Sequence, residues 1–340
     1  MLDFKALRRQ EWGFVGRAGH RFFPIGVFQT IRPNKVRPVS PAHLMSSKIL
    51  IFCGKGGVGK TTLSLAFGLR RASAGERVLI VTSHPLPELA IAVSLDGLSA
   101  QYPAAAKNLF IVHLNPHELL LEVVHRHFPV AAAAEAIIRS SLFQNLIEVA
   151  PGLKEFYFLS RMQQLCERKV PESAIPAYDL LMWDAPATGH FLTTLHSAHT
   201  FDHYLSGPLA SAGAEVARFF SNISNVSLLP VATLEEMAIA ETLDMTQALE
   251  KEFQLKCWRL LLNLVSPMVT ASEQDVAQLE EPSDPVTRFA FGRGRVERER
   301  AQFLRRAVGA PSLAVPRLGH SATDLDLLGR IAALLEMPVD

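Results

Sequence analysis

The sequence predicts an α/β fold in which a doubly wound, mostly parallel sheet is covered by helices on both faces. From residue 48 onward, short apolar runs rich in β-branched residues alternate with longer helical patterns. The runs are continuously apolar, which is typical of strands that are buried on both faces. A glycine-rich turn follows the first run, and an acid ends a run in the middle of the chain.

Taken in order, the apolar runs and helical patterns define the expected elements. The predicted strands are Ile49–Cys53, Val78–Thr82, Leu109–Leu114, Asp179–Trp183, Val226–Val231, Arg259–Val265 and Leu313–Val315. The clearest predicted helices are Thr62–Ala74, Leu234–Glu252 and Thr323–Leu335. The stretch from Pro116 to Tyr178 is long, helical in pattern and without a convincing strand. We therefore expect one domain over residues 46–340, with a helical insertion subdomain at about 116–178 and 204–222.

The first 45 residues differ from the rest of the chain. They hold eight Lys or Arg, two acids and several prolines, without sustained periodicity. We interpret residues 1–45 as a disordered basic leader. The alternative is that the start is mis-annotated and that the protein begins at Met45. The segment lacks the apolar core of a secretory signal.

Composition limits the function classes. After residue 45 the chain carries 26 basic and 31 acidic residues, so no nucleic acid is expected as a partner. The three cysteines are far apart and form no CxxC pair, which indicates neither a disulfide framework nor a zinc site. The apolar runs are far shorter than the roughly 20 residues of a membrane helix. We expect a soluble, cytoplasmic protein.

The glycine-rich turn reads G-K-G-G-V-G-K-T from Gly54 to Thr61 and matches the phosphate-binding P-loop, G-x-x-x-x-G-K-[ST]. Its place between a predicted strand and a predicted helix is the context that the motif requires. Glycines let backbone N–H groups approach phosphates, Lys60 reaches the β- and γ-phosphate oxygens, and Thr61 supplies an oxygen to Mg²⁺. The predicted ATP-binding residues are Gly54, Gly56, Gly57, Val58, Gly59, Lys60, Thr61 and Thr62.

A second motif, W-D-A-P-A-T-G-H, ends at His190. It places the carboxylate of Asp184 at the carboxyl end of a strand, where open α/β sheets bind nucleotides. We expect Asp184 to hold Mg²⁺ or its waters together with Thr61. His190 follows a Thr-Gly pair in a predicted loop, so it either couples the nucleotide state to the helical region or stabilises the loop.

The two motifs carry a resemblance to known ATPases. With Lys55 as a second P-loop lysine, the sequence resembles the deviant Walker A class, and D-A-P-A-T-G-H is similar to switch II of the arsenical pump-driving and tail-anchored-protein-targeting ATPase family. The resemblance covers about residues 48 to 340. It implies a nucleotide-sandwich homodimer in which Lys55 reaches the partner's nucleotide. It also implies that Asn263, at the end of a predicted strand, recognises adenine.

The sequence departs from this family at switch I. The family has an Asp there that positions the attacking water, whereas this chain has His84, with Glu88 as a second candidate. His84 either acts on the water or is a turn residue that leaves hydrolysis slow. The family's zinc CxxC pair and clustered metalloid thiolates are also absent.

The leading hypothesis is a dimeric ATPase switch with Lys55, Lys60, Asp184 and His84 as candidate catalytic residues and with Mg²⁺ and ATP as cofactors. Its partner is either a membrane-protein client or a pump subunit. An apolar set on the segment 156–165 either lines a client groove or packs in the core. The alternatives are a nucleotide-sensing scaffold with little hydrolysis and, third, a partition or septum-positioning ATPase.

Overall fold

The computed structural model describes residues 47–84, 101–127, 130–141, 143, 152–204, 208–277, 282–319 and 323–335. All of them belong to one compact unit that is contained in Pro33–Asp340. The predictions for residues 1–45 and for Glu88 lie outside the described residues.

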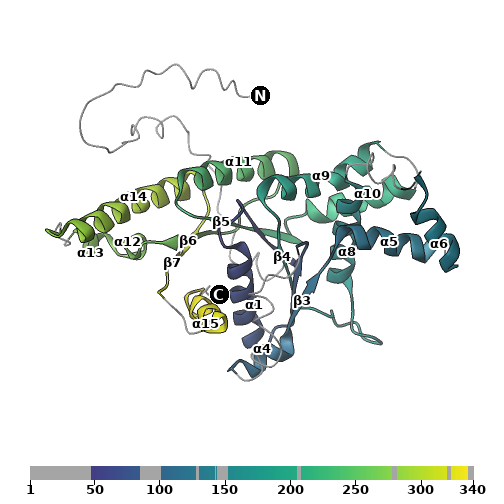
Figure 1. The fold of residues 1–340 in the computed structure, drawn as a ribbon, viewed down its shortest axis with the longest axis horizontal. Coiled ribbons are helices and arrows are strands. Elements are labelled where there is room, and N and C mark those ends of the chain that lie inside the picture. Colours follow the sequence, from purple (N-terminus) through teal and green to yellow (C-terminus); the bar gives the residue numbers. More distant parts are fainter. Residues whose placement is uncertain are drawn as a thin grey trace, which may run out of the picture. The chain divides into compact units, whose positions relative to one another are not determined.

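A seven-stranded sheet forms the centre of this unit (Figure 1). Its strands are β1 (Ile49–Cys53), β2 (Val78–Thr82), β3 (Leu109–His113), β4 (Leu180–Asp184), β5 (Val226–Ala232), β6 (Leu260–Val265) and β7 (Ser312–Pro316). They follow the order β3-β2-β4-β1-β5-β6-β7, and every pairing among them is parallel. The predicted fold class is confirmed, and each predicted strand lies within one residue of its predicted ends.

The strand order explains where a ligand binds in such a sheet. After β1 the chain crosses through α1 (Lys60–Ser73) to β2, which lies on one side of β1, whereas β5 pairs with β1 on the other side. The order of strands therefore reverses at β1. In open α/β sheets, the crevice at the carboxyl ends of the strands beside such a reversal is the ligand site.

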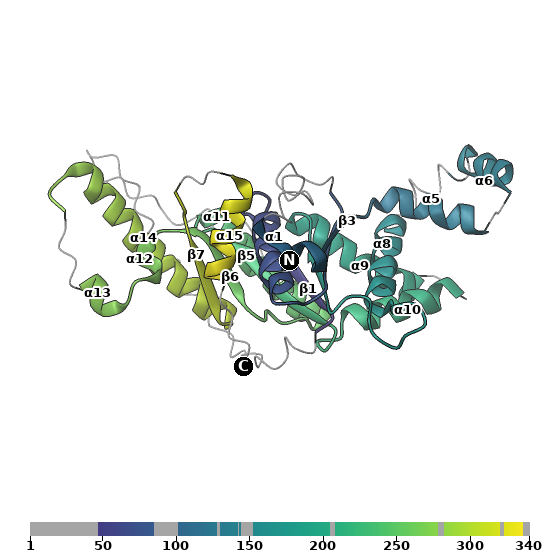
Figure 2. The ribbon, with the colours of Figure 1, turned by 90° about the horizontal axis from the view of Figure 1, so that it is seen from below.

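One face of the sheet is covered by α1, α4 (Pro103–Asn108) and α15 (Asp324–Leu334). Leu50 and Phe52 of β1 share a core cluster with Phe67 of α1 and Leu328 of α15, and all four are at most 2% exposed. Figures 1 and 2 both show α15 beside α1. The alternation along β1 sends its other side chains, such as Ile51, to the opposite face.

The opposite face is covered by α8 (Leu153–Glu167), α9 (Thr188–Tyr204), α10 (Pro208–Phe220) and α11 (Glu236–Phe253). Trp183 of β4 is fully buried at its centre. Its ring lies 5.4 Å from Phe158 of α8, 5.3 Å from Phe191 of α9 and 6.5 Å from Phe220 of α10, measured between ring centroids. One aromatic cluster thus joins three helices to the strand that ends in Asp184.

The segment 116–178 is helical, as predicted, and holds α5 (Pro116–His127), α6 (Ala131–Ile138) and α8. An ion pair between Arg161 and Glu122 joins α8 to α5. The apolar residues of α8 that were considered for a client groove are core residues. Phe156, Phe158, Leu159 and Met162 are each at most 2% exposed, so the groove interpretation is wrong for them. The boundary of a separate helical subdomain stays a prediction.

The β6 and β7 end of the sheet carries helices that the sequence did not predict. These are α12 (Pro267–Thr270), α13 (Glu273–Ala277) and α14 (Pro285–Val308). Gly294 of α14 packs against α12, since a Cβ there would lie 3.0 Å from Ser266 Oγ and 3.2 Å from Met268. Within the described ranges, no helix combines the length and the apolar character that crossing a membrane requires.

Candidate nucleotide-binding site

The loop between β1 and α1 has a backbone that only glycines adopt without strain. Gly54 and Gly59 have φ of +141° and +93°. Both also lie against neighbouring atoms, since a Cβ on Gly54 would lie 2.3 Å from the Val231 carbonyl oxygen and one on Gly59 would lie 2.3 Å from Asn263 Nδ2. Gly56 and Gly57 are exposed and Val58 is buried. The loop is therefore pressed onto β5 and β6, and its glycines provide a cradle that approaching phosphates can reach.

Lys60 lies in the first turn of α1, and its ammonium group reaches back over the loop. Nζ donates to the carbonyl oxygens of Gly54 and Lys55, each at 2.9 Å. The residue is only 8% exposed, and burial lowers the pKa of its ammonium group, which the nearby Asp184 charge partly opposes. No carboxylate of the described chain forms an ion pair with it. The positive charge is thus held in the loop for an anion.

Asp184 ends β4 beside the loop and is 7% exposed. Thr61 Oγ1 donates to its Oδ2 at 2.6 Å, while its Oδ1 is buried with no hydrogen-bond partner in the described chain. Burial raises the pKa of the carboxyl group, whereas the Thr61 hydrogen bond and the charges of Lys60 and His84 lower it. A carboxylate oxygen without a partner beside a hydroxyl is a donor set that fits Mg²⁺.

The strand register brings together groups that are distant in sequence. Asp184 pairs with Phe52 of β1 and with Thr82 of β2, so it lies level with the start of the P-loop. Thr61 and Asp184 are 123 positions apart and are nevertheless joined by a hydrogen bond. The structure therefore brings the two predicted motifs into one site. Thr62, the next predicted contact, is half-buried in the same turn of α1.

The segment after Asp184 differs from the prediction. Thr188, Gly189 and His190 form the first turn of α9, so the predicted loop is wrong for His190. The Phe191 amide donates to the Ala187 carbonyl at 3.0 Å, and the buried Phe191 ring fixes this turn against Trp183. Thr188 is a further candidate site residue that was not predicted, although it lies within the second motif. Its Oγ1 is buried without a partner in the described chain, four residues after Asp184.

Asn263 lies within β6, two residues before the strand ends, and contacts the P-loop itself. Its Nδ2 donates to the Val58 carbonyl at 2.8 Å, and the residue is 5% exposed. The amide nitrogen therefore supports the loop beside Gly59. The implied contact with adenine stays a prediction.

Two other predicted residues have fewer contacts. Lys55 is half-buried, and its ammonium group forms no ion pair with the described chain. His84 follows β2, is exposed, and forms a tight turn in which its amide donates to Thr82 Oγ1 at 3.1 Å. Its Nδ1 lies 3.2 Å from Ser83 Oγ. The pairing of Thr82 with Asp184 places His84 on the same edge of the sheet, where its charge acts on the Asp184 carboxyl.

Comparison with known proteins places this site in a family. The sequence model of the anion-transporting ATPases matches residues 47–246, which include the P-loop and Asp184. The chain belongs to the anion-transporting ATPase family. ATPase BagA of Mycobacterium tuberculosis is 24% identical over 255 residues, which is 71% of this chain and 72% of that protein. A putative arsenical pump-driving ATPase of Prosthecochloris vibrioformis is 29% identical over 151 residues, or 44% of this chain and 35% of the relative.

An ATPase of Malassezia globosa, named GET3, is 24% identical over 201 residues, 58% of this chain and 57% of that protein. The family and its relatives support an ATPase type of function and nucleotide binding for this chain. The resemblance inferred from the two motifs is therefore confirmed at the level of the family.

Proposed function

We propose that this protein hydrolyses Mg²⁺-ATP as a homodimeric switch and that the nucleotide state controls a client or a membrane partner. The observation that carries the proposal is the hydrogen bond from Thr61 Oγ1 to Asp184 Oδ2, with the buried, unpartnered Asp184 Oδ1 beside it. A carboxylate that is buried at a cost, and that has one oxygen without a partner, is suited to a cation.

Different residues of the chain bind the phosphates, hold the metal and orient the attacking water. Backbone N–H groups of the P-loop and the N-terminus of α1 bind phosphate oxygens. The Lys60 ammonium exchanges its two carbonyl acceptors for the β- and γ-phosphates. Thr61 and Asp184 would hold Mg²⁺, which would supply positive charge that stabilises the negative charge of the phosphates. His84 orients the attacking water or, if it is only a turn residue, leaves that step slow.

Lys55 is the residue that we assign to the dimer. The ammonium group is half-buried at the loop and has no ion pair in the described chain, so it is available to another molecule's phosphates. Closure of two P-loops around two nucleotides would bring each Lys55 to the partner's site. This is the arrangement that the resemblance to the deviant Walker A class implies.

Asp184 also provides a path from the nucleotide to the helices. Three residues separate it from α9, whose Phe191 packs on Trp183 together with Phe158 of α8. A shift of Asp184 on metal binding would move the start of α9, and the aromatic cluster would pass the shift to α8 and α10. The client is either a hydrophobic membrane segment, as the resemblance to the tail-anchored-protein-targeting ATPases implies, or a pump subunit, as the name of the arsenical pump-driving relative suggests.

The experiment measures Mg²⁺-dependent ATP turnover and molecular mass for the wild type, Lys60→Ala and Lys55→Ala. We expect turnover in the wild type and its loss in both variants. A non-hydrolysable ATP analogue should double the molecular mass of the wild type but not that of Lys55→Ala. Arg139→Ala, an exposed residue directly after α6 and far from the loop in sequence, is the control. Wild-type levels of turnover in Lys60→Ala would contradict the proposal.

A nucleotide-sensing scaffold is the second candidate, and the exposed His84 in place of an acid favours it. This candidate predicts tight ATP binding and dimerisation with the bound ATP remaining intact over many hours. Turnover that falls in His84→Ala while ATP affinity is unchanged would support the enzyme and exclude the scaffold.

A further inference from the structure

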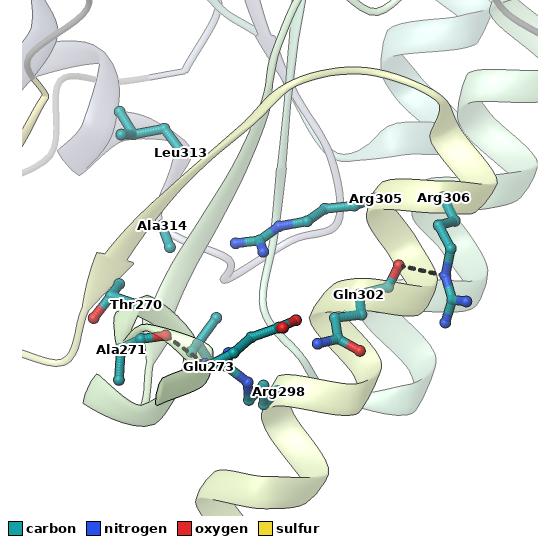
Figure 3. Close-up of a pocket in the computed structure, with 10 residues that line it drawn as sticks. Thr270, Ala271, Glu273, Arg298, Gln302, Arg305, Arg306, Leu313 and Ala314 are labelled. Atoms are coloured by element: carbon teal, nitrogen blue, oxygen red, sulfur yellow. Dashed lines mark hydrogen bonds between the residues drawn. The ribbon is translucent and has the colours of Figure 1, made fainter. Parts of the chain in front are cut away.

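A groove of about 680 Å³ lies between α12, α14 and β7 (Figure 3). One side carries polar side chains of α14, and the facing side is formed by the residues around the end of α12 and by β7, whose Ala314 faces α14 while the Leu313 side chain packs on the other face of the sheet. The lining residues are Val269, Thr270, Ala271, Glu273, Arg298, Gln302, Arg305, Arg306, Leu313 and Ala314. None of them belongs to the P-loop or to the Asp184 segment. The volume lies in the range of about 300–1,000 Å³ that is typical of small-molecule sites.

The groove has an excess of positive charge. Three arginines line it, against one carboxylate, Glu273, and no ion pair joins Glu273 to these arginines within the described residues. Burial lowers the pKa of Arg305 and is the larger cause, and the Arg298 charge lowers this pKa further. The guanidinium groups of Arg298 and Arg305 therefore lie close enough for their charges to interact. Like charges so placed are unfavourable unless an anion joins them.

Both arginines are positioned by neutral groups, which leaves part of each donor fork available. Arg298 Nη1 donates to the carbonyl oxygens of Met268 at 2.7 Å and Ala271 at 2.6 Å. Arg305 Nε donates to Ser312 Oγ at 2.6 Å, and its two terminal nitrogens have no partner in the described chain. In Figure 3 the Arg305 side chain extends from α14 toward β7, across the groove. The side chains are therefore held in place without their charge being neutralised.

We propose that this groove binds a small organic phosphate, with the phosphate on Arg305 and Arg298 and the organic body beside Thr270, Ala271 and Ala314. A phosphate monoester carries up to two negative charges near neutral pH and has three acceptor oxygens, which match a surplus of two positive charges and the free donors. The site is separate from the nucleotide site and does not depend on the proposed ATPase activity.

The test is a calorimetric titration of the purified full chain with phenyl phosphate. The P-loop also attracts phosphates, so each titration is repeated in the Lys60→Ala background. We expect binding to persist there and to weaken by about tenfold or more in Arg305→Gln, because a hydrogen bond to a charged group is lost. Arg295→Gln, an exposed residue of α14 outside the groove, is the matched control and should bind like the wild type.

Three results would overturn the proposal. They are no binding of phenyl phosphate in the Lys60→Ala background, unchanged binding in Arg305→Gln, and binding of benzoate as tight as that of phenyl phosphate. If Arg305→Gln melts below the wild type, Arg305→Lys replaces it, because lysine keeps the positive charge but lacks the two terminal guanidinium nitrogens. Full binding by Arg305→Lys would then contradict the role of the Arg305 guanidinium group.

Discussion

The contact between Gly59 and Asn263 predicts a specific pattern of stability. In Gly59→Ala, the new Cβ would lie 2.3 Å from Asn263 Nδ2, at a φ of +93°. A left-handed L-residue costs about 1–2 kcal/mol. Displacing the Asn263 amide would leave the Val58 carbonyl without its partner, which costs about 1–3 kcal/mol. The free energy of unfolding should therefore fall by about 2–5 kcal/mol, as the sum of these two costs.

Two other loop glycines serve as matched controls, measured by urea unfolding of the ligand-free protein. Gly57→Ala has a φ of +83° with no atom within 4 Å of its Cβ, so it should lose only about 1–2 kcal/mol. Gly56 does not have a positive φ, and a Cβ there would lie 3.9 Å from Ala187 Cβ, so the stability of Gly56→Ala should be nearly unchanged.

A double-mutant cycle isolates the contact. In an Asn263→Ala background the steric partner is gone, so Gly59→Ala should cost only the backbone part, about 1–2 kcal/mol. The reasoning would be refuted if Gly59→Ala destabilised the protein equally in both backgrounds. It would also be refuted if Gly57→Ala cost as much as Gly59→Ala.

Three further predictions concern charge and reactivity. Asp184→Asn should abolish Mg²⁺-dependent nucleotide binding, measured by calorimetry. The same variant should stabilise the ligand-free protein at pH values above the raised pKa of this carboxyl, because its folded state no longer buries a negative charge. A loss of stability at neutral pH would contradict this. Burial raises the pKa of Cys53 and Cys166 to about 12 and that of Cys257 well above its usual value, so a thiol reagent at neutral pH should label them only after denaturation. Fast labelling of the native protein would instead support a thiolate site. Lys55→Ala should bind ATP within about threefold of the wild type while failing to dimerise, since on the dimer proposal it contacts only the partner's phosphates.

The strands were predictable because each is a short, continuously apolar run, and tertiary contacts do not change this pattern. Runs such as Val78–Thr82 are apolar on both faces and end at turn residues, so burial on both sides determines their type. The P-loop motif was equally informative, because its glycines are required by left-handed angles and close contacts. The register that joins Asp184 to Thr61 follows from parallel strands whose carboxyl ends meet at one edge.

The rest depended on packing between distant segments. Helix α14 was missed because Gly292, Gly294 and several arginines obscure its pattern, and Gly294 is explained only by its contact with α12. Likewise, Thr188 and His190 were predicted to lie in a loop, while the buried Phe191 ring draws them into α9. The hydrogen bond of Asn263 to Val58 joins residues 205 positions apart, and no local pattern indicates it.

The central claim is that Lys60, Thr61 and Asp184 form one site for Mg²⁺ and ATP. The most direct test is a calorimetric titration of a non-hydrolysable ATP analogue into wild type, Lys60→Ala and Asp184→Asn, each with Mg²⁺ and with a chelator. We predict tight binding only by the wild type with Mg²⁺, and in Asp184→Asn weak binding that no longer depends on the metal. Equal affinity with and without Mg²⁺ in the wild type, or metal-dependent binding that survives in Asp184→Asn, would contradict the account.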